Sequence, residues 1–310
     1  MELRIFVEPQ EGATYQQQLA MALAAERHGF GAFFRSDHLL RIAPGDGSPG
    51  PTDSWVTLAA LARETSTIRL GTMVTSATFR LPGLLAVAVA QVDEMSGGRV
   101  EVGLGAGWFE AEHKAYGVPF PAFGDRFERL EEQLEILTGM WSTPAGEEYS
   151  FSGRHYELAP GPALPKPTQR PHPPVIVGGT GPRRTPALAA RVAAEFNVAF
   201  MGVEATQKRF EAARAACAER GRDPDSLVCS HAVTVCCASD EAGLVRRAER
   251  IGRPVEDLRE NGAAGTPAEV AARLIEFRDV GAARSYLQVM DVDDLDHVAL
   301  IAAEVMPLVG

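Results

Sequence analysis

The sequence predicts an α/β fold of the (β/α)8 barrel type, formed as a single domain over residues 1–310 with insertions in the barrel loops. Strand-like and helix-like segments alternate along most of the chain, which indicates a parallel sheet covered by helices. About eight of these segments resemble strands, which fits a closed barrel better than an open, doubly wound sheet. With 45% hydrophobic residues, the chain has enough apolar side chains for such a core.

The expected strands are short segments rich in branched and aromatic residues. They are residues 3–7, 32–35, 68–74, 100–104, 175–177, 198–200, 231–237 and 285–289. Amphipathic helices are expected between them, chiefly at residues 15–28, 54–64, 84–95, 126–141 and 184–194. The clearest helix is residues 126–141, because apolar residues such as Phe127, Leu130 and Leu134 recur every three or four positions.

Two segments interrupt the alternation and are expected to be loop insertions. Residues 145–174 contain a hairpin that turns at Ser152-Gly153, followed by a proline-rich stretch of extended chain. Residues 253–265 are expected to form a second insertion near the barrel mouth.

The composition argues against several classes of protein. A formal net charge of −11 argues against binding to nucleic acid or to an anionic membrane surface. The four cysteines form no Cys-x-x-Cys pair, so we expect buried, reduced thiols and a cytoplasmic location. Residues 3–7 already resemble a strand, so no signal peptide is expected, and the longest apolar run, residues 84–90, is too short to span a bilayer.

The segment from Phe33 to His38 is the most informative part of the chain. Phe33 and Phe34 belong to a buried strand, after which the chain becomes polar at Asp37 and His38. The carboxyl ends of barrel strands carry the active-site residues, and histidine transfers protons readily near neutral pH. His38 is therefore the first candidate for proton transfer, and Asp37 is expected to orient it or to contact a ligand. The alternative is a capping Asp and a loop His without a catalytic role.

A second candidate site is the loop Gly178-Gly179-Thr180-Gly181, which follows an expected strand and precedes an expected helix. Glycines allow a ligand to approach the backbone closely, and the free N–H groups of a helix N-terminus bind phosphate. Pro182 is expected in the first turn of that helix, where a missing N–H has no effect. The loop is therefore predicted to bind an anion, and an ordinary βα turn is the alternative.

A third candidate is the stretch Gly-Leu-Gly-Ala-Gly at residues 103–107. It resembles the dinucleotide-binding fingerprint, but Trp108 occupies the place of the third glycine. We interpret it as a strand end at which a flat ligand lies close to the backbone. The polar residues that follow are Glu110, Glu112 and His113. The two carboxylates are candidates for acid, base or substrate-binding roles, or form the charged first turn of a helix.

These segments together resemble the bacterial luciferase-like superfamily of flavin and deazaflavin oxidoreductases, most closely its branch that uses coenzyme F420. The matching segments are residues 34–38, 70–75, 78–80, 96–99, 103–112 and 175–184, in order over the first two thirds of the chain. The resemblance implies a (β/α)8 barrel with the cofactor over its carboxyl end and a non-proline cis peptide at Met73–Val74 behind the cofactor ring. The implied cofactor-binding residues are Asp37, Thr72, Met73, Val74, Gly105, Ala106, Gly107, Gly178, Gly179, Thr180 and Gly181. Trp108 stands where the family's glucose-6-phosphate dehydrogenases carry a Glu proton donor, which argues against a sugar-phosphate substrate.

We therefore expect an oxidoreductase that transfers a hydride between F420 and an unidentified small organic substrate. The catalytic candidates are His38, Asp37 and Glu112, and a homodimer is expected. The first alternative is an FMN-dependent luciferase-like monooxygenase, because the sequence discriminates the two cofactors poorly. The remaining alternatives are a non-catalytic ligand-binding barrel and a metal-dependent barrel hydrolase that uses Asp37, His38, Glu112 and His113. No metal site is expected, since the aspartates at positions 291–296 lack the glycine of a calcium loop.

Overall fold

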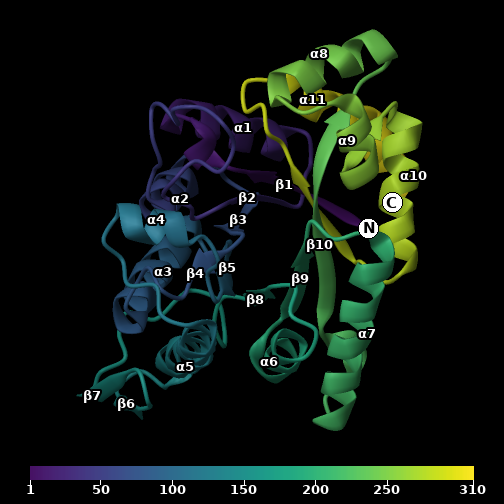
Figure 1. Ribbon diagram of the computed structural model, residues 1–310. Helices are drawn as coiled ribbons and strands as arrows, with labels where there is room; N and C mark the ends of the chain where they lie inside the picture. Colours follow the sequence, from purple (N-terminus) through teal and green to yellow (C-terminus); the bar gives the residue numbers. More distant parts are fainter.

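A computed structural model describes all residues from 1 to 310, and its centre is a closed barrel of parallel strands (Figure 1). In the order in which they pair, the barrel strands are β1 (Glu2–Val7), β2 (Ala32–Arg35), β3 (Arg69–Thr72), β5 (Val100–Gly105), β8 (Val175–Gly178), β9 (Glu195–Ala199), β10 (Val228–Cys237) and β12 (Arg284–Gln288). β12 then pairs with β1, with Ile5 opposite Leu287, and this closes the barrel. The predicted (β/α)8 fold is confirmed.

Helices cover the outside of the barrel (Figure 1). The longer ones are α1 (Tyr15–Arg27), α2 (Ser54–Glu64), α3 (Pro82–Ser96), α5 (Phe123–Ser142), α6 (Arg184–Val192), α7 (Val203–Glu219), α8 (Glu241–Ile251) and α10 (Pro267–Asp279). The shorter ones are α4 (Glu110–Ala115), α9 (Val255–Asn261), α11 (Leu295–Leu300) and α12 (Met306–Val309). Local side chains determine where helices begin: Thr14 and Gln17 form a capping box at α1, and Asp53 accepts the N–H groups of Trp55 and Val56 at α2. None of the helices has the length and the apolar composition needed to cross a membrane.

The sixth barrel strand begins at Glu195 rather than at residue 198, so the expected boundary was wrong. Glu195 and Asn197 are polar, which hid the strand from a search for apolar runs. Both are buried in the structure: Glu195 accepts a hydrogen bond from Tyr286 at 2.8 Å, and Asn197 donates one to Ser230 at 2.8 Å. Phe200 lies beyond the strand and has a left-handed φ of 55°.

The third barrel strand is interrupted where the sequence predicted a continuous one. β3 ends at Thr72, the Met73–Val74 peptide is cis as predicted, and the ladder resumes as β4 (Thr75–Ser76) beside β5. Both insertions are present. The first forms the predicted hairpin of β6 (Tyr149–Ser152) and β7 (Glu157–Gly161), and the second contains α9 and β11 (Ala263–Gly265), which extends the sheet beside β10.

The amino-terminal half of the barrel interior is filled by four buried side chains that we call the polar plug: Arg4, Glu101, Glu195 and Tyr286. Arg4 Nη1 donates to Glu101 Oε2 at 2.6 Å and to the Tyr286 hydroxyl at 3.0 Å. The Tyr286 hydroxyl in turn donates to Glu195. An apolar layer that includes Phe6, Phe34 and Met73 packs against Tyr286 on the side of the carboxyl ends. The plug and this layer fill the barrel at the amino-terminal ends of its strands, so the barrel is open to a ligand at the carboxyl ends.

Candidate active site

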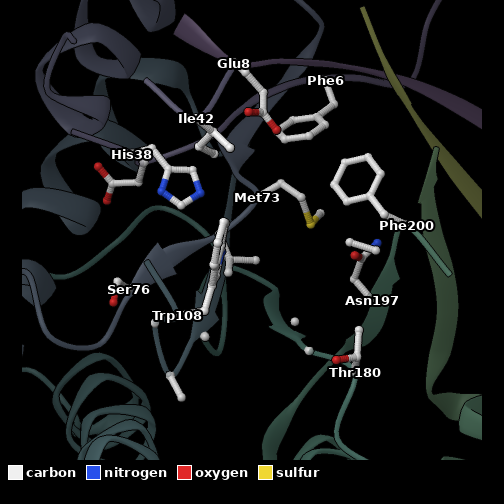
Figure 2. A pocket seen from close by; sticks show the side chains of 18 of the residues that line it. Phe6, Glu8, His38, Ile42, Met73, Ser76, Trp108, Thr180, Asn197 and Phe200 are labelled. Carbon is white, nitrogen blue, oxygen red and sulfur yellow. The ribbon is translucent and has the colours of Figure 1, made fainter. Parts of the chain in front are cut away.

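A cavity of about 870 Å³ opens at the carboxyl ends of the barrel strands. The predicted site residues that line it are Asp37, His38, Met73, Val74, Gly105, Ala106, Gly107, Glu112, Gly178, Gly179, Thr180 and Gly181. Figure 2 shows that side chains from opposite sides of the barrel, including Glu8, His38, Trp108 and Thr180, surround this space. Thr72 does not line it: its hydroxyl is buried behind the wall and donates to the carbonyl oxygen of Gly103 at 3.1 Å.

His38 is held by Glu112, which α4 brings to it from a distant part of the sequence. His38 Nδ1 lies 3.0 and 3.1 Å from the two carboxylate oxygens of Glu112, and the backbone N–H of Leu39 donates to the same carboxylate at 2.8 Å. Glu112 is only 1% exposed. Burial lowers the pKa of His38, but the hydrogen bond and charge of Glu112, with Glu8 and Asp37 further away, outweigh burial and raise the pKa above its usual value. The pair therefore favours an imidazolium whose Nε2 remains available.

Asp37 does not orient His38, which corrects one of the two roles expected for it. Its carboxylate forms an ion pair with Arg80, whose Nη2 donates to Asp37 Oδ1 at 3.2 Å, and accepts the hydroxyl of Thr75 at 2.9 Å. Arg80 also pairs with Asp53, the residue that caps α2. Asp37 is 3% exposed and lies at the cavity wall. No spacing pattern predicted Arg80 as the partner of Asp37, because the loop that carries Arg80 follows a different strand.

Glu8 is a site residue that the sequence reasoning missed. It follows β1 directly and points into the cavity (Figure 2). Its carboxylate accepts amide hydrogens from Gln288 at 2.7 Å and from Gln10 at 2.6 Å. Burial raises the pKa of Glu8 above its usual value, against the opposing effects of His38 and of the two amides. The sequence did contain a signal for Glu8, because an acidic residue at the end of the first strand is the same pattern that identified Asp37.

The glycines of β5 and β8 make room for Val74. A Cβ atom built on Gly103, Gly105 or Gly178 would lie 2.8 to 2.9 Å from a methyl group of Val74, closer than packed carbons approach. These positions were interpreted as places where a ligand meets the backbone. At Gly103 the structure corrects that interpretation, because this glycine packs against Thr72 and Val74 and does not line the cavity. The glycines act mainly by letting Val74 stand at the cavity wall.

The loop of residues 178–181 has the free donors that an anion needs. The backbone N–H groups of Thr180 and Gly181 donate no backbone hydrogen bond, and Gly179 has a left-handed φ of 153°. Thr185, in the first turn of α6, packs against the loop and lines the same cavity. α6 begins at Arg184, so Pro182 precedes the helix instead of lying in its first turn, which corrects that expectation. Arg209 of α7 stabilises the loop by donating to the carbonyl oxygen of Thr180 at 2.7 Å.

The residues after β5 have different environments. Trp108 is 63% exposed at the cavity wall, with its ring edge-to-face to His38 at a centroid distance of 5.6 Å. Glu110 faces solvent and pairs with Lys114, away from the cavity lining. His113 is buried and bonded to Thr78 and to the carbonyl oxygen of Phe109.

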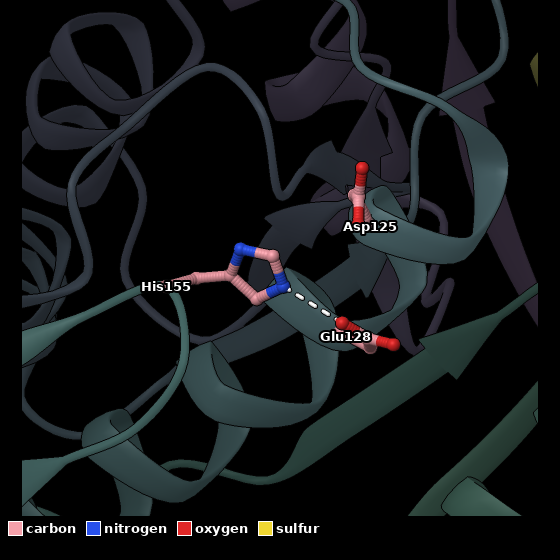
Figure 3. A group of neighbouring side chains, drawn as sticks. All are labelled: Asp125, Glu128 and His155. Atoms are coloured by element: carbon pink, nitrogen blue, oxygen red, sulfur yellow. Dashed lines mark hydrogen bonds and ion pairs between the residues drawn. The ribbon is translucent and has the colours of Figure 1, made fainter.

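The residues considered for a metal-dependent hydrolase do not gather around one point. The one group whose potential ligand atoms all lie within 4.8 Å of one another is Asp125, Glu128 and His155 (Figure 3). This group joins α5 to the turn of the β6–β7 hairpin. Glu128 accepts hydrogen bonds from His155 at 2.9 Å and from Arg154 at 2.8 Å, so an arginine already balances its charge. The hydrogen bonds of this group hold the hairpin against α5.

Comparison with known proteins gives consistent matches. The family model described as luciferase-like monooxygenase matches residues 1–253. An FMNH(2)-dependent dimethylsulfone monooxygenase of Pseudomonas putida is 30% identical over 207 residues, which are 67% of this chain and 54% of that protein. An F420-dependent glucose-6-phosphate dehydrogenase of Microbacterium testaceum is 34% identical over 177 residues, 56% of this chain and 50% of that protein. The chain thus matches little more than half the length of these curated relatives. The crystal structure of monooxygenase RslO1 from Streptomyces bottropensis superposes with a TM-score of 0.82 at 25% identity, over 99% of both chains.

Proposed function

The chain belongs to the luciferase-like monooxygenase family, and from this premise we propose that it is an oxidoreductase that transfers a hydride between coenzyme F420 and a small organic substrate. One observation carries the proposal: a single cavity joins the Met73–Val74 wall, the loop of residues 178–181 and the His38–Glu112 pair. Such a transfer needs the cofactor ring and a proton donor beside the substrate, and binding of the cofactor's phosphate holds the ring in position.

The residues at the cavity fit a phosphorylated ring cofactor. The free N–H groups of Thr180 and Gly181 and the N-terminus of α6 suit a phosphate. The wall formed by Val74 and residues 105–107 has no side chain larger than Val, which suits a flat ring. We propose that the residues that hold the cofactor are Asp37, Met73, Val74, Gly105, Ala106, Gly107, Gly178, Gly179, Thr180 and Gly181, with Thr72 acting indirectly by fixing Gly103.

When bound, the cofactor supplies or accepts the hydride, and the side chains manage the proton. Glu112 occupies Nδ1 of His38, so Nε2 is the atom that exchanges a proton with the substrate. Glu112 is a positioning residue that also raises the pKa of His38 and so favours the protonated imidazole. Asp37 holds Arg80 and through it the start of α2, which keeps the wall beside His38 in place. Trp108 shields the ring of His38 from solvent on one side.

An FMN-dependent monooxygenase is the second candidate function. The dimethylsulfone monooxygenase and RslO1 support it, since both are monooxygenases and the first is named for reduced FMN. The two cofactors share a phosphate and a tricyclic ring, so the cavity suits both. The test is a titration of the purified protein with F420 and with FMN, followed by the visible spectrum of the bound species. Binding at least tenfold tighter for F420 supports the first function, the reverse order supports the second, and no binding of either contradicts both.

We also propose that the protein is a homodimer. The neighbouring helices α2 and α3 and the loop before α3 expose Val56, Leu81 and Leu84, each more than half accessible, and exposed apolar groups of this kind mark interfaces. Sedimentation should give a dimer for the wild type and for Leu308→Glu, an exposed leucine elsewhere, but a monomer for Leu84→Glu. A monomeric wild type would contradict the proposal.

A further inference from the structure

A second histidine is connected to the cavity by two hydroxyl groups. His113 Nε2 lies 2.6 Å from the hydroxyl oxygen of Thr78, and that oxygen lies 2.6 Å from Oγ of Ser76. The other ring nitrogen, Nδ1, lies 2.8 Å from the carbonyl oxygen of Phe109. Ser76 lines the cavity, whereas His113 is fully buried. The chain Ser76–Thr78–His113 therefore runs from the cavity wall into the protein.

The surroundings of His113 leave it no other polar partner. Its ring packs against those of Phe79 and Phe120, at centroid distances of 4.9 and 4.6 Å. The charged groups nearby have partners of their own: Glu112 binds His38, and Glu110 binds Lys114. Arg126 stacks on the ring of Phe120, with its guanidinium carbon 3.8 Å from the ring centroid.

The direction of the hydrogen bonds follows from what each group can do. A carbonyl oxygen only accepts, so His113 Nδ1 carries a proton. In a ring that holds this single proton, Nε2 accepts. Thr78 then donates its one hydroxyl proton to Nε2. Its oxygen must then accept the proton of Ser76, so Ser76 has no proton left for the cavity. The backbone N–H of Thr78, 3.5 Å from Ser76 Oγ, takes at most one of its two lone pairs.

Gly107 keeps the hydroxyl of Ser76 in this position. Its φ of 80° is left-handed, and a Cβ atom there would overlap Ser76 Oγ and come within 3.3 Å of Thr78 Oγ1. Any larger residue would displace the hydroxyl of Ser76 and crowd that of Thr78. The glycine predicted as part of a ligand-binding strand end therefore also packs over the hydrogen-bonded chain.

We infer that the chain Ser76–Thr78–His113 holds Ser76 as a hydrogen-bond acceptor towards the cavity and selects ligands that present an N–H or O–H group there. The inference rests on the proposed function for its ligand class, since the rings of flavins and deazaflavins both carry an imide N–H. Ser76 contacts the ligand, and Thr78 and His113 are positioning residues that fix the orientation of the Ser76 hydroxyl. A ligand offering only acceptors at this point would leave Ser76 facing it without a proton to donate.

The direction of the chain is tested first in the free protein. Imidazole nitrogen NMR of ¹⁵N-histidine-labelled protein, with His113→Gln or, if that variant does not fold, Thr78→Val to identify the signal, should show a proton on Nδ1 and a bare, hydrogen-bonded Nε2. A proton on Nε2, in a ring with one proton or with two, would overturn the inference. This measurement needs no ligand, so it decides the direction even if neither F420 nor FMN binds and the proposed function fails.

The selectivity is tested by a double-mutant cycle on binding. The probes are FMN and its N3-methyl analogue, measured with the wild type, Ser76→Ala, Thr78→Val and Thr78→Ser. Ser76→Ala should weaken FMN binding about tenfold, as expected for one lost hydrogen bond, and should not weaken binding of the methylated analogue. Thr78→Val, which frees the Ser76 proton, should reduce this preference, and Thr78→Ser should restore it. Equal effects of Ser76→Ala on both probes, in a protein that binds FMN, would overturn the inference and leave the proposed function standing.

Discussion

The two ends of the barrel use the same kinds of side chain in different ways. In the polar plug, Arg4, Glu101, Glu195 and Tyr286 bind one another. Arg69 and Arg284, the first residues of β3 and β12, add ion pairs to the two glutamates. At the cavity, Glu8 and His38 are half-buried and hydrogen-bonded, and each keeps one side towards open space. Charges that satisfy one another specify the fold, whereas charges held with one side open are available for chemistry.

Breaking the plug should give the largest loss of stability. In Glu101→Ala the buried Arg4 loses its one buried carboxylate partner and keeps only the partly exposed Glu2, and breaking a buried ion pair in this way destabilises a protein by about 3–5 kcal/mol. Urea denaturation of this variant against the wild type measures the loss. A change below about 1 kcal/mol, typical of exposed pairs, would show that the plug does not hold the barrel together.

Removing His38 should affect chemistry more than the stability of the fold. His38→Ala should lower the rate of the hydride step by about 10²-fold or more, because proton transfer is lost, with little change in cofactor affinity. Stopped-flow absorbance of the cofactor, at saturating cofactor, measures this rate. A rate within about threefold of wild type would be too small for acid–base catalysis, and Glu8 would then be the next candidate.

Changing Glu112 to Gln should shift the titration of His38. The carboxylate raises the pKa of His38, so this pairing stabilises the folded protein below the unfolded pKa of about 6.5, and the stabilisation is lost as the pH rises through the folded pKa. In Glu112→Gln the pKa of His38 should fall, and the variant should lose stability at pH 6 but not at pH 9. Proton NMR of the imidazole and denaturation at the two pH values check this. An unchanged titration would mean that another group sets the pKa.

A smaller effect of opposite sign is expected at Glu8. Burial raises its pKa, so the ionised carboxylate opposes folding, and wild-type stability falls as the pH rises from about 4.3 through the folded pKa. Glu8→Gln should therefore match the wild type at pH 4 and exceed it at pH 8. Thermal unfolding at both pH values measures the difference. A variant less stable at pH 8 would show that the amides of Gln10 and Gln288 need the charged form.

The sequence predicted the fold better than the contacts within the site. Strand and helix periodicity predicted the barrel, and residues at strand ends identified part of the cavity lining, because both depend on local pattern. Polar residues inside strands, such as Glu195, disrupted the pattern. The pairing of Asp37 with Arg80 and of His38 with Glu112 joins loops far apart in the chain, so no spacing could predict which carboxylate holds the histidine.

The central claim is that the open end of the barrel is a cofactor site, and paired glycine variants test it most directly. Gly179 lies in the anion loop with a left-handed φ and Thr185 at 3.2 Å from a built Cβ, whereas Gly202, before α7, has an ordinary φ of −65° and nothing within 4 Å. Fluorescence titration of F420 or FMN, whichever binds the wild type, should show at least tenfold weaker binding to Gly179→Val and unchanged binding to Gly202→Val. Equal affinities of wild type and a folded Gly179→Val would contradict the account.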